Sequence, residues 1–586
     1  LDQGGTFTDI IAIRPDGKMI AKKILSNASS HNYNPIWNGI NQILKENKIF
    51  SSYPISRINI GTTIGTNTLL ERKGAKVLFC VTKGFRDNFI IGNQKRDNLF
   101  TRHHTRYKPI YHKIIEIDER VSKSGKIIKK LDNNDVEKQL KKNFKLGINA
   151  LSITLINSFK FSKHEKIIKD IAKKIGYKYI SCSSEICPMI NYTTRGYTTA
   201  ADNYLNPIIK KFTNKISDLF ADSHISYMQS SGFLSNKKNF SGKTSILSGP
   251  AGGVNAGIHL AKLNNINEVI GFDMGGTSTD VWHFAGDVEK RLETKFSGIY
   301  LKTPVLNIDS IASGGGSLIS YKQKRFIVGP NSAGAYPGPS CYRNNGPLTI
   351  TDCNLILGRI IPDFFPKYFG KNKSQKISKV PSKKKFLILL KKVQKDYPQI
   401  KNISLLANAF LDVAVENMSS TIKKITTHKG FDIEKYSLLV LGSASGQLAC
   451  KVAEKLKIKK IIFHPLSGFL SAYGAGLSMK GETFEQSCEK TLNKSNLQSL
   501  VESMKGDIKK KYYNVKLIHI IRLKYFGSNT VISLSLKSMN ISKLKSLFKK
   551  KHLKSYGFYY NNKDIIIDSI ETEAILEDSF KFRFKP

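Results

Sequence analysis

Two stretches of this sequence carry residues whose types and spacing suit phosphate chemistry. Residues 2–9 read DQGGTFTD and residues 273–280 read DMGGTSTD, so both follow the pattern D-x-G-G-T-x-T-D. Paired glycines let a backbone turn sharply and leave its N–H groups open to an anion, while hydroxyls and a carboxylate suit phosphate and Mg²⁺. One copy could be a plain hairpin turn. Two copies predict two related lobes, each of which offers a phosphate loop to one nucleotide.

Further glycine turns follow along the chain. Residues 248–253 (SGPAGG) open an expected helix and could either hold an anion or simply start that helix. Residues 313–317 (SGGGS) and 442–447 (GSASGQ) each follow an apolar run that reads as a strand. Residues 328–343 (VGPNSAGAYPGPSCYR) are too rich in proline and glycine for regular structure, which predicts a long ordered loop of functional importance.

The elements that must position these motifs alternate between strands and helices. Apolar runs predict a hairpin around residues 15–17 and strands at 77–82, 150–156 and 179–183, and amphipathic spacing predicts helices at 135–144, 164–175 and 406–425. This alternation indicates an α/β fold with a largely parallel sheet. After about residue 492 the pattern changes to a small α+β domain with strands at 515–523, 531–536 and 565–575.

Composition narrows the classes of function. The 586 residues are 40% hydrophobic, with neither a membrane-length apolar run nor a signal peptide. The net charge of +48 comes mostly from lysines spread over the chain, and no nucleic-acid-binding motif accompanies it, so no specific nucleic-acid partner is expected. Seven widely spaced cysteines indicate a reducing, cytoplasmic location. The sequence begins at Leu1 directly on the first motif, so a few upstream residues are expected to be missing.

The motifs together resemble a known family. The two D-x-G-G-T-x-T-D loops and the turn at 442 resemble the phosphate and adenosine motifs of the actin, heat-shock chaperone and sugar kinase ATPase superfamily. The chain is more specifically similar to the A-type subunit of the hydantoinase/oxoprolinase family, above all to the A half of ATP-dependent 5-oxoprolinases. The segments that carry the resemblance are 2–10, 61–75, 82–87, 246–254, 271–281, 328–354, 415–426 and 464–476.

The resemblance implies both a fold and a mechanism. The fold would be two actin-like, acetate-kinase-like (ribonuclease H-like) lobes around a nucleotide cleft, plus a small C-terminal α+β domain. The domains would be residues 1–185 (N-terminal lobe), 186–485 (hydantoinase A/oxoprolinase domain) and 490–586 (acetophenone-carboxylase-like domain). ATP would phosphorylate the carbonyl oxygen of a lactam or imide such as 5-oxo-L-proline, and the activated carbon would take water and yield L-glutamate in glutathione metabolism.

The resemblance also assigns roles to residues of this sequence. Asp2, Asp9, Asp273 and Asp280 are the implied catalytic residues, and Asp2 and Asp273 are also the implied Mg²⁺ ligands. Gly4, Gly5, Thr6, Gly275, Gly276 and Thr277 would hold the ATP phosphates, and Gly442 and Gly446 would approach the adenosine. Arg195, Gly315 and Gly316 are candidates for contact with the substrate.

Several alternatives stay open. The adenosine motif of the family is close to GGAGGQHA, whereas residues 442–449 read GSASGQLA, so Ser443 and Ser445 replace glycines and Leu448 stands where histidine is usual. A non-catalytic nucleotide-binding scaffold subunit is therefore one alternative. An ATP-using subunit of an N-methylhydantoinase, or of an acetone or acetophenone carboxylase, is another. The resemblance further implies a B-type partner subunit and hence a hetero-oligomer.

Overall fold

The computed structural model has a mixed α/β fold, as the alternation of strand and helix signals predicts. It describes residues 1–5, 7–26, 34–48, 55–92, 108–286, 288–296, 298–365, 367, 369–370 and 374–576. Contacts divide the chain into two compact units. Unit 1 comprises Leu1–Phe50, Pro250–Glu289 and Leu306–Leu477, and unit 2 comprises Ser51–Gly249, Lys290–Val305 and Ser478–Pro586. Because each unit combines distant segments, the three consecutive domains expected from the sequence stay a prediction.

An antiparallel ladder begins unit 1. β1 (Asp2–Gln3) pairs with β2 (Phe7–Ile13), and β2 pairs with β3 (Met19–Leu25) across the hairpin that the sequence predicts. The helix α1 (Pro35–Glu46) packs on β2 and β3, and the side chain of Asn34 caps its first N–H groups. The first D-x-G-G-T-x-T-D motif therefore lies at the start of this ladder.

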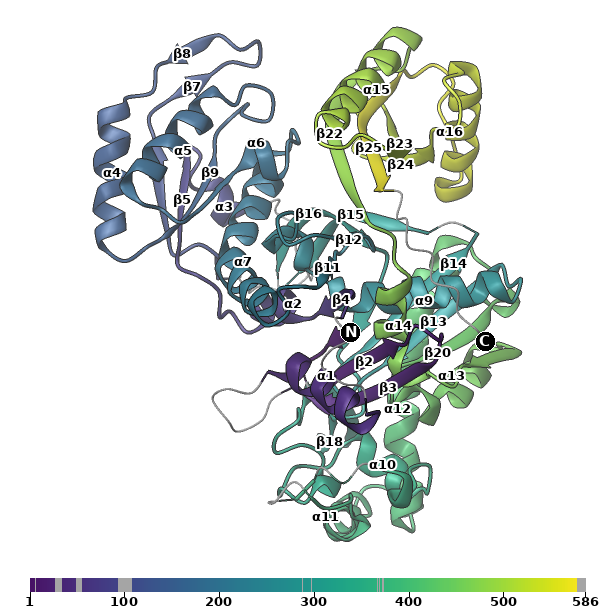
Figure 1. Cartoon of the computed structure of the whole chain (residues 1–586). Coiled ribbons are helices and arrows are strands. Elements are labelled where there is room, and N and C mark those ends of the chain that lie inside the picture. The colour runs from purple at the N-terminus through teal and green to yellow at the C-terminus, as the bar shows by residue number, and fades with distance from the viewer. Residues whose placement is uncertain are drawn as a thin grey trace. The chain divides into compact units, whose positions relative to one another are not determined.

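A five-stranded sheet lies at the centre of unit 1, in the order β17-β14-β13-β20-β21 (Figure 1). β13, β20 and β21 run parallel, whereas β14 is antiparallel to both of its neighbours. The second motif spans the β13–β14 hairpin. Since parallel strands end at the same edge of a sheet, the turn after β20 lies beside the end of β13. The bounds of the strands are β13 (Glu268–Met274), β14 (Thr279–Ala285), β17 (Asp309–Ile311), β20 (Ser437–Leu441) and β21 (Lys460–Phe463).

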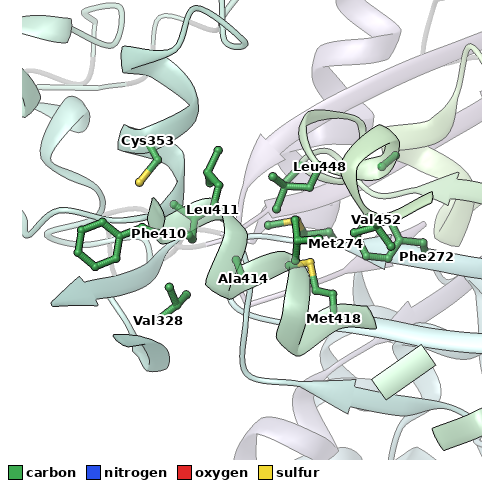
Figure 2. Packing of buried hydrophobic residues seen from close by; sticks show 14 of the residues in the cluster. Phe272, Met274, Val328, Cys353, Phe410, Leu411, Ala414, Met418, Leu448 and Val452 are labelled. Carbon is green, nitrogen blue, oxygen red and sulfur yellow. The ribbon is translucent and has the colours of Figure 1, made fainter. Parts of the chain in front are cut away.

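The main core of unit 1 lies between this sheet and α12 (Ile403–Ile425), the long helix that the sequence predicts. Phe410 and Met418 project from α12 and are fully buried. Figure 2 shows them in one cluster with Phe272 and Met274 of β13. Buried apolar packing of this kind holds in place the strand that leads into the second glycine loop.

The proline- and glycine-rich segment 328–343 contains more regular structure than its composition predicts. β19 (Arg325–Ser332) pairs antiparallel with β18 (Ser317–Lys322), and a short 3₁₀ helix covers Ser340–Tyr342. The prediction of an irregular loop was therefore wrong for these residues. The physical reason is that β18 and β19 form a two-stranded sheet, in which a proline can lie on the side without a partner strand.

Unit 2 contains a parallel sheet in the order β10-β9-β5-β6, which confirms the predicted βα pattern. The helix α7, 28 residues long, and every other helix in the described ranges lack the combination of length and apolar character that crossing a membrane requires. The elements of this part are β4 (Arg57–Thr62), β5 (Val77–Thr82), β6 (Lys113–Ile117), α4 (Asn133–Lys145), β9 (Ala150–Thr154), α5 (Lys163–Ile175), β10 (Tyr179–Cys182), α7 (Tyr192–Leu219) and β11 (His224–Met228).

The C-terminal part of unit 2 is an antiparallel sheet in the order β22-β25-β23-β24, covered by α15 (Lys494–Lys509) and α16 (Ile541–Tyr556). Three of its strands match the predicted ones. The first strand was missed because its sequence, GETFEQSCEKT, has few apolar residues. The strands are β22 (Gly481–Thr491), β23 (Val515–Tyr525), β24 (Ile532–Ser535) and β25 (Ile565–Leu576).

The packing of α12 yields a stability prediction. Phe410→Ala leaves a cavity in the core and should lower the free energy of unfolding by about 3–5 kcal/mol. Leu405→Ala, on the same helix but 46% exposed, should change it by less than about 0.5 kcal/mol. Urea denaturation followed by circular dichroism measures both, and equal effects would contradict this account of the core.

Candidate functional site

The two motifs form the same hairpin. In the first, Asp2 on β1 is the cross-strand partner of Asp9 on β2. In the second, Asp273 on β13 is the cross-strand partner of Asp280 on β14. Each loop thus carries one aspartate at either end, on paired strands, and the repeat in sequence is a repeat in structure.

The two loops also contain the same kind of turn. The N–H of Gly4 donates to the carbonyl of Phe7 at 3.0 Å, and the N–H of Gly275 donates to the carbonyl of Ser278 at 3.0 Å. Gly276 is exposed, and a Cβ built on it would meet nothing within 4 Å. Its backbone is therefore free to approach a ligand closely, as a phosphate loop requires. Gly5 and Thr277 are exposed as well, and Thr6 lies outside the described residues.

The four aspartates of the loops lie close enough to influence one another. Burial, with Asp9 as the next largest cause, raises the pKa of Asp2 to about 7. Burial, followed by Asp280, raises the pKa of Asp273 to about 8. Burial alone raises the pKa of Asp280 to about 6. Such a cluster of half-buried carboxylates is unfavourable by itself and attracts a cation.

A lysine that sequence reasoning missed partly balances this charge. Nζ of Lys23 forms an ion pair with Asp9 and donates to the carbonyl of Gly468 at 3.3 Å. Lys23 and Asp9 are cross-strand partners on β3 and β2, so the predicted hairpin register could have revealed the pair. Asp280 instead accepts a hydrogen bond from the hydroxyl of Ser310. The two loops are therefore alike in backbone and unlike in charge.

The turn after β20 touches the second loop. Gly442 has a φ of +80°, and a Cβ built on it would lie 2.4 Å from Oδ1 of Asp273 and 2.5 Å from the carbonyl oxygen of Met274. The N–H of Ala444 donates to that same carbonyl at 3.0 Å. Only glycine combines this backbone conformation with so close an approach.

The serines and the leucine that depart from the family pattern at this turn lie mostly inside the protein. Ser445 is fully buried, and its Oγ accepts a hydrogen bond of 2.7 Å from the N–H of Met274. Leu448 is 1% exposed and belongs to the core of α12. Ser443 alone of the three is exposed. Ser445 and Leu448 thus brace the turn and the strand β13.

The SGGGS segment, residues 313–317, is hydrogen-bonded to the backbone of the second loop. The N–H groups of Gly315 and Gly316 donate to the carbonyls of Gly275 and Gly276 at 3.0 and 2.6 Å. A Cβ on Gly314 would lie 2.7 Å from the backbone of the loop. All three glycines of the segment are buried, so the structure gives Gly315 and Gly316 a supporting position, and their contact with substrate stays a prediction.

One short helix, α10 (Ile350–Ile356), ties these segments together, which the sequence did not reveal. Thr351 donates from both its N–H and its Oγ1 to the carbonyl of Gly315 at 2.8 Å. Asn354 donates to the side chain of Gln447 in the turn after β20 at 2.9 Å. Asp352 accepts hydrogen bonds from the N–H groups of Ser340 and Cys341, within the proline-rich segment, and from donors of Thr349 and Ser382, which follow it.

Arg195 lies elsewhere, on α7 of unit 2, and is 1% exposed. Its guanidinium donates to the carbonyls of Met189 and Leu155, each at 2.7 Å, and to Oγ of Ser183 at 3.1 Å. These internal acceptors account for its burial. A role in substrate contact stays a prediction that these hydrogen bonds do not support.

The residues of the loops fit a magnesium ion. Oδ1 of Asp2 is buried and has no hydrogen-bond partner among the residues that the structure describes, and the neighbouring aspartates supply hard oxygen donors. Within the described ranges no three His, Cys, Asp or Glu side chains converge as a ready-made metal site. Mg²⁺ commonly binds through one or two carboxylates together with phosphate oxygens and water, so a nucleotide would complete the coordination.

Solved structures share this fold. An ATP-dependent caprolactamase from Pseudomonas jessenii matches with a TM-score of 0.83 and 22% identity over 98% of this chain and 87% of its own. A nucleotide-free acetone carboxylase matches with a TM-score of 0.77 and 19% identity over 98% of this chain and 87% of its own. The likeness confirms the predicted fold class, an α/β protein with actin-like lobes.

The chain belongs to the hydantoinase/oxoprolinase family. The sequence model of the family described as Hydantoinase/oxoprolinase matches residues 195–483, and that of the Hydantoinase/oxoprolinase N-terminal region matches residues 1–176. The 5-oxoprolinase of Dictyostelium discoideum is 37% identical over 98% of this chain and 50% of its own length. That of Saccharomyces cerevisiae is 36% identical over 98% and 49%. The chain thus spans about half the length of these relatives.

The contact of Gly442 with Asp273 yields a prediction. Gly442→Ala should lower stability and weaken Mg-ATP binding because the added methyl meets Asp273 and the backbone of Met274. Gly430→Ala is a matched control, since Gly430 has a φ of +79° but nothing within 4 Å of its added Cβ. Thermal melting should show Gly442→Ala to be the less stable by about 1–3 kcal/mol. Equal stability of the two variants would contradict the close approach.

The pair of Lys23 with Asp9 yields another prediction. Lys23→Met leaves a half-buried carboxylate without its cation and should cost about 1–3 kcal/mol of stability near neutral pH. The loss should shrink at acid pH, because a protonated Asp9 no longer needs the lysine. Lys22→Met breaks only the neighbouring surface pair with Glu46 and should cost less than about 1 kcal/mol. Equal losses in urea denaturation would count against a special role for Lys23.

Proposed function

We propose that this chain is the ATP-using half of a 5-oxoprolinase-type cyclic amide hydrolase of the cytoplasm. One observation carries the proposal. The chain contains two glycine hairpins of the same pattern and a third turn, which touches Asp273. It is also 36–37% identical to 5-oxoprolinases over 98% of its length. The substrate proposed is 5-oxo-L-proline and the product L-glutamate, a reaction of glutathione metabolism.

In this proposal the backbone of the two loops clasps the ATP phosphates. The open N–H groups around Gly5 and Gly276 and the hydroxyl of Thr277 donate to phosphate oxygens. Asp2 and Asp273 would hold Mg²⁺, which would supply positive charge to the phosphates. Gly442 and Gly446 are the proposed contacts with the adenosine, since a glycine backbone can come close to a ligand.

The chemistry explains why ATP is needed. The carbonyl carbon of a five-membered lactam is a poor electrophile, because the ring nitrogen donates electrons to it. Attack of the carbonyl oxygen on the γ-phosphorus forms an O–P bond, releases ADP and converts that oxygen into a leaving group. Water then adds to the carbon, the C–N bond breaks and the nitrogen takes up a proton, which leaves an acyl phosphate. A second water hydrolyses this acyl phosphate to the carboxylate of L-glutamate and inorganic phosphate. Asp280 accepts a hydrogen bond from Ser310, and within the described ranges no lysine pairs with it as Lys23 pairs with Asp9, so it is the aspartate proposed to accept a proton.

The proposal includes a B-type half. The chain spans about half the length of its 5-oxoprolinase relatives. We assign the remaining steps to this second half and propose that it is a separate subunit of a hetero-oligomer. Caprolactamase of Pseudomonas jessenii, whose alpha subunit is 27% identical over 82% of this chain, gives a precedent for division into subunits.

A second candidate substrate follows from the same neighbours. The caprolactamase and the acetone carboxylase share the fold, so a larger lactam, a hydantoin, or a ketone with bicarbonate could replace 5-oxoproline at the carbonyl position. Both of these neighbours are described as ATP-dependent. A scaffold that binds nucleotide without turnover is the remaining alternative, and the inward position of Ser445 and Leu448 argues against it.

The test is ADP release from Mg-ATP in the presence of 5-oxoproline, with and without a co-expressed B-type subunit. The expected result is substrate-dependent ADP release that rises with the partner. ADP release with hydantoins or ketones but none with 5-oxoproline would contradict the proposed substrate. No ADP release with any carbonyl compound would contradict the proposal that the chain is part of an enzyme.

A variant tests the site. Asp273→Asn should reduce ADP release by at least about a hundredfold, the scale on which positioned charged groups act in catalysis. It should not destabilise the nucleotide-free protein, because it removes one of four repelling carboxylates. Asp222→Asn, at an exposed position, is the control. Near-normal turnover in Asp273→Asn would contradict its assignment to the magnesium site.

A further inference from the structure

An exposed aromatic ring stands beside the turn that follows β20. Phe463 is the last residue of β21, and 54% of its side chain is exposed. Its cross-strand partner is Val440 on β20, which comes two residues before Gly442. Because β20 and β21 are parallel, the ring lies at the edge of the sheet where this turn meets the second phosphate loop.

The nearest part of the turn is open toward this ring. Gly446 is exposed, and a Cβ built on it would meet a single neighbour within 4 Å, namely Cε1 of Phe463 at 3.5 Å. The ring and the bare backbone of Gly446 thus border the same space. Because residue 446 is a glycine, the position beside this ring atom that a Cβ would fill is not taken up by a side chain of that residue.

Hydrogen bonds fix both sides of this space. On the side of the turn, Arg359 donates to the carbonyl of Gln447 at 3.1 Å, and Asn354 donates to its side chain at 2.9 Å. Behind Phe463, the N–H of Ser467 donates to the carbonyl of His464 at 2.9 Å, and the carbonyl of Ser467 accepts the N–H of Gly442 at 2.9 Å. The turn and the segment that follows Phe463 are therefore held in place by hydrogen bonds within the protein, which lowers the entropic cost of binding a ligand here.

We propose that Phe463 is the platform on which the adenine base of the nucleotide stacks. The inference rests on the proposed function, which assigns the phosphates to the loops at Gly5 and Gly276 and the adenosine to Gly442 and Gly446. A nucleotide that continues in the same direction brings its base to Gly446 and to the exposed ring. An uncharged aromatic ring contributes little to the binding of a phosphate but stacks on the flat face of a base. Its contribution to binding is therefore specific to the base.

Binding measurements with two ligands separate the base from the phosphates. Isothermal titration calorimetry of the chain with Mg-ATP and with Mg-tripolyphosphate measures each affinity. Phe463→Ala should weaken Mg-ATP binding about tenfold or more, as loss of base stacking does elsewhere. It should leave the affinity for Mg-tripolyphosphate unchanged. Phe463→Trp keeps an aromatic face and should bind Mg-ATP about as well as the wild type.

Phe364→Ala is the matched control, since Phe364 is a phenylalanine of unit 1 with 87% of its side chain exposed. It should change neither affinity. Unaltered Mg-ATP binding by Phe463→Ala, or an equal loss for both ligands, would overturn the stacking proposal while the phosphate site stands. A wild-type chain that binds neither ligand would overturn the proposed function itself. Thermal melting of each variant checks that the fold is intact.

Discussion

The site depends on one close approach between backbone and carboxylate. Gly442 passes so near Asp273 that a single methyl group would collide with Oδ1 and with the carbonyl of Met274. This contact fixes the turn after β20 against the end of β13, and the buried hydroxyl of Ser445 secures it from the other side. The second glycine loop begins at Gly275, one residue after Met274. Its position is therefore fixed by packing within the protein, without a bound ligand.

The two glycine hairpins have the same backbone but different charged neighbours. Both hairpins use the same turn and the same pair of aspartates. Lys23 holds Asp9 in an ion pair, whereas among the described residues Asp280 accepts a hydrogen bond from the hydroxyl of Ser310. The same backbone is thus combined with two different electrostatic surroundings. This difference is the basis for proposing different roles for the two carboxylates.

Much of the site could be predicted from the sequence, because the repeat itself encodes the hairpins and local periodicity encodes β13, β20 and α12. The supporting contacts could not. Glycines report that something approaches the backbone closely but not what approaches, so the SGGGS segment read as a ligand loop although it packs under Gly275 and Gly276. Likewise β19, which is paired with β18, continues through Gly329, Pro330 and Asn331, residues of poor strand propensity. Such contacts join segments distant in sequence, and no local pattern contains them.

The most direct test of the central claim is hydrogen–deuterium exchange of the chain with and without saturating Mg-ATP. If the two loops clasp one nucleotide, peptides containing residues 4–9 and peptides containing residues 275–280 both gain protection in the same titration. The turn at 442–447 should gain protection with them. Protection of one loop alone, or of neither while calorimetry detects bound nucleotide, would contradict the two-loop clasp.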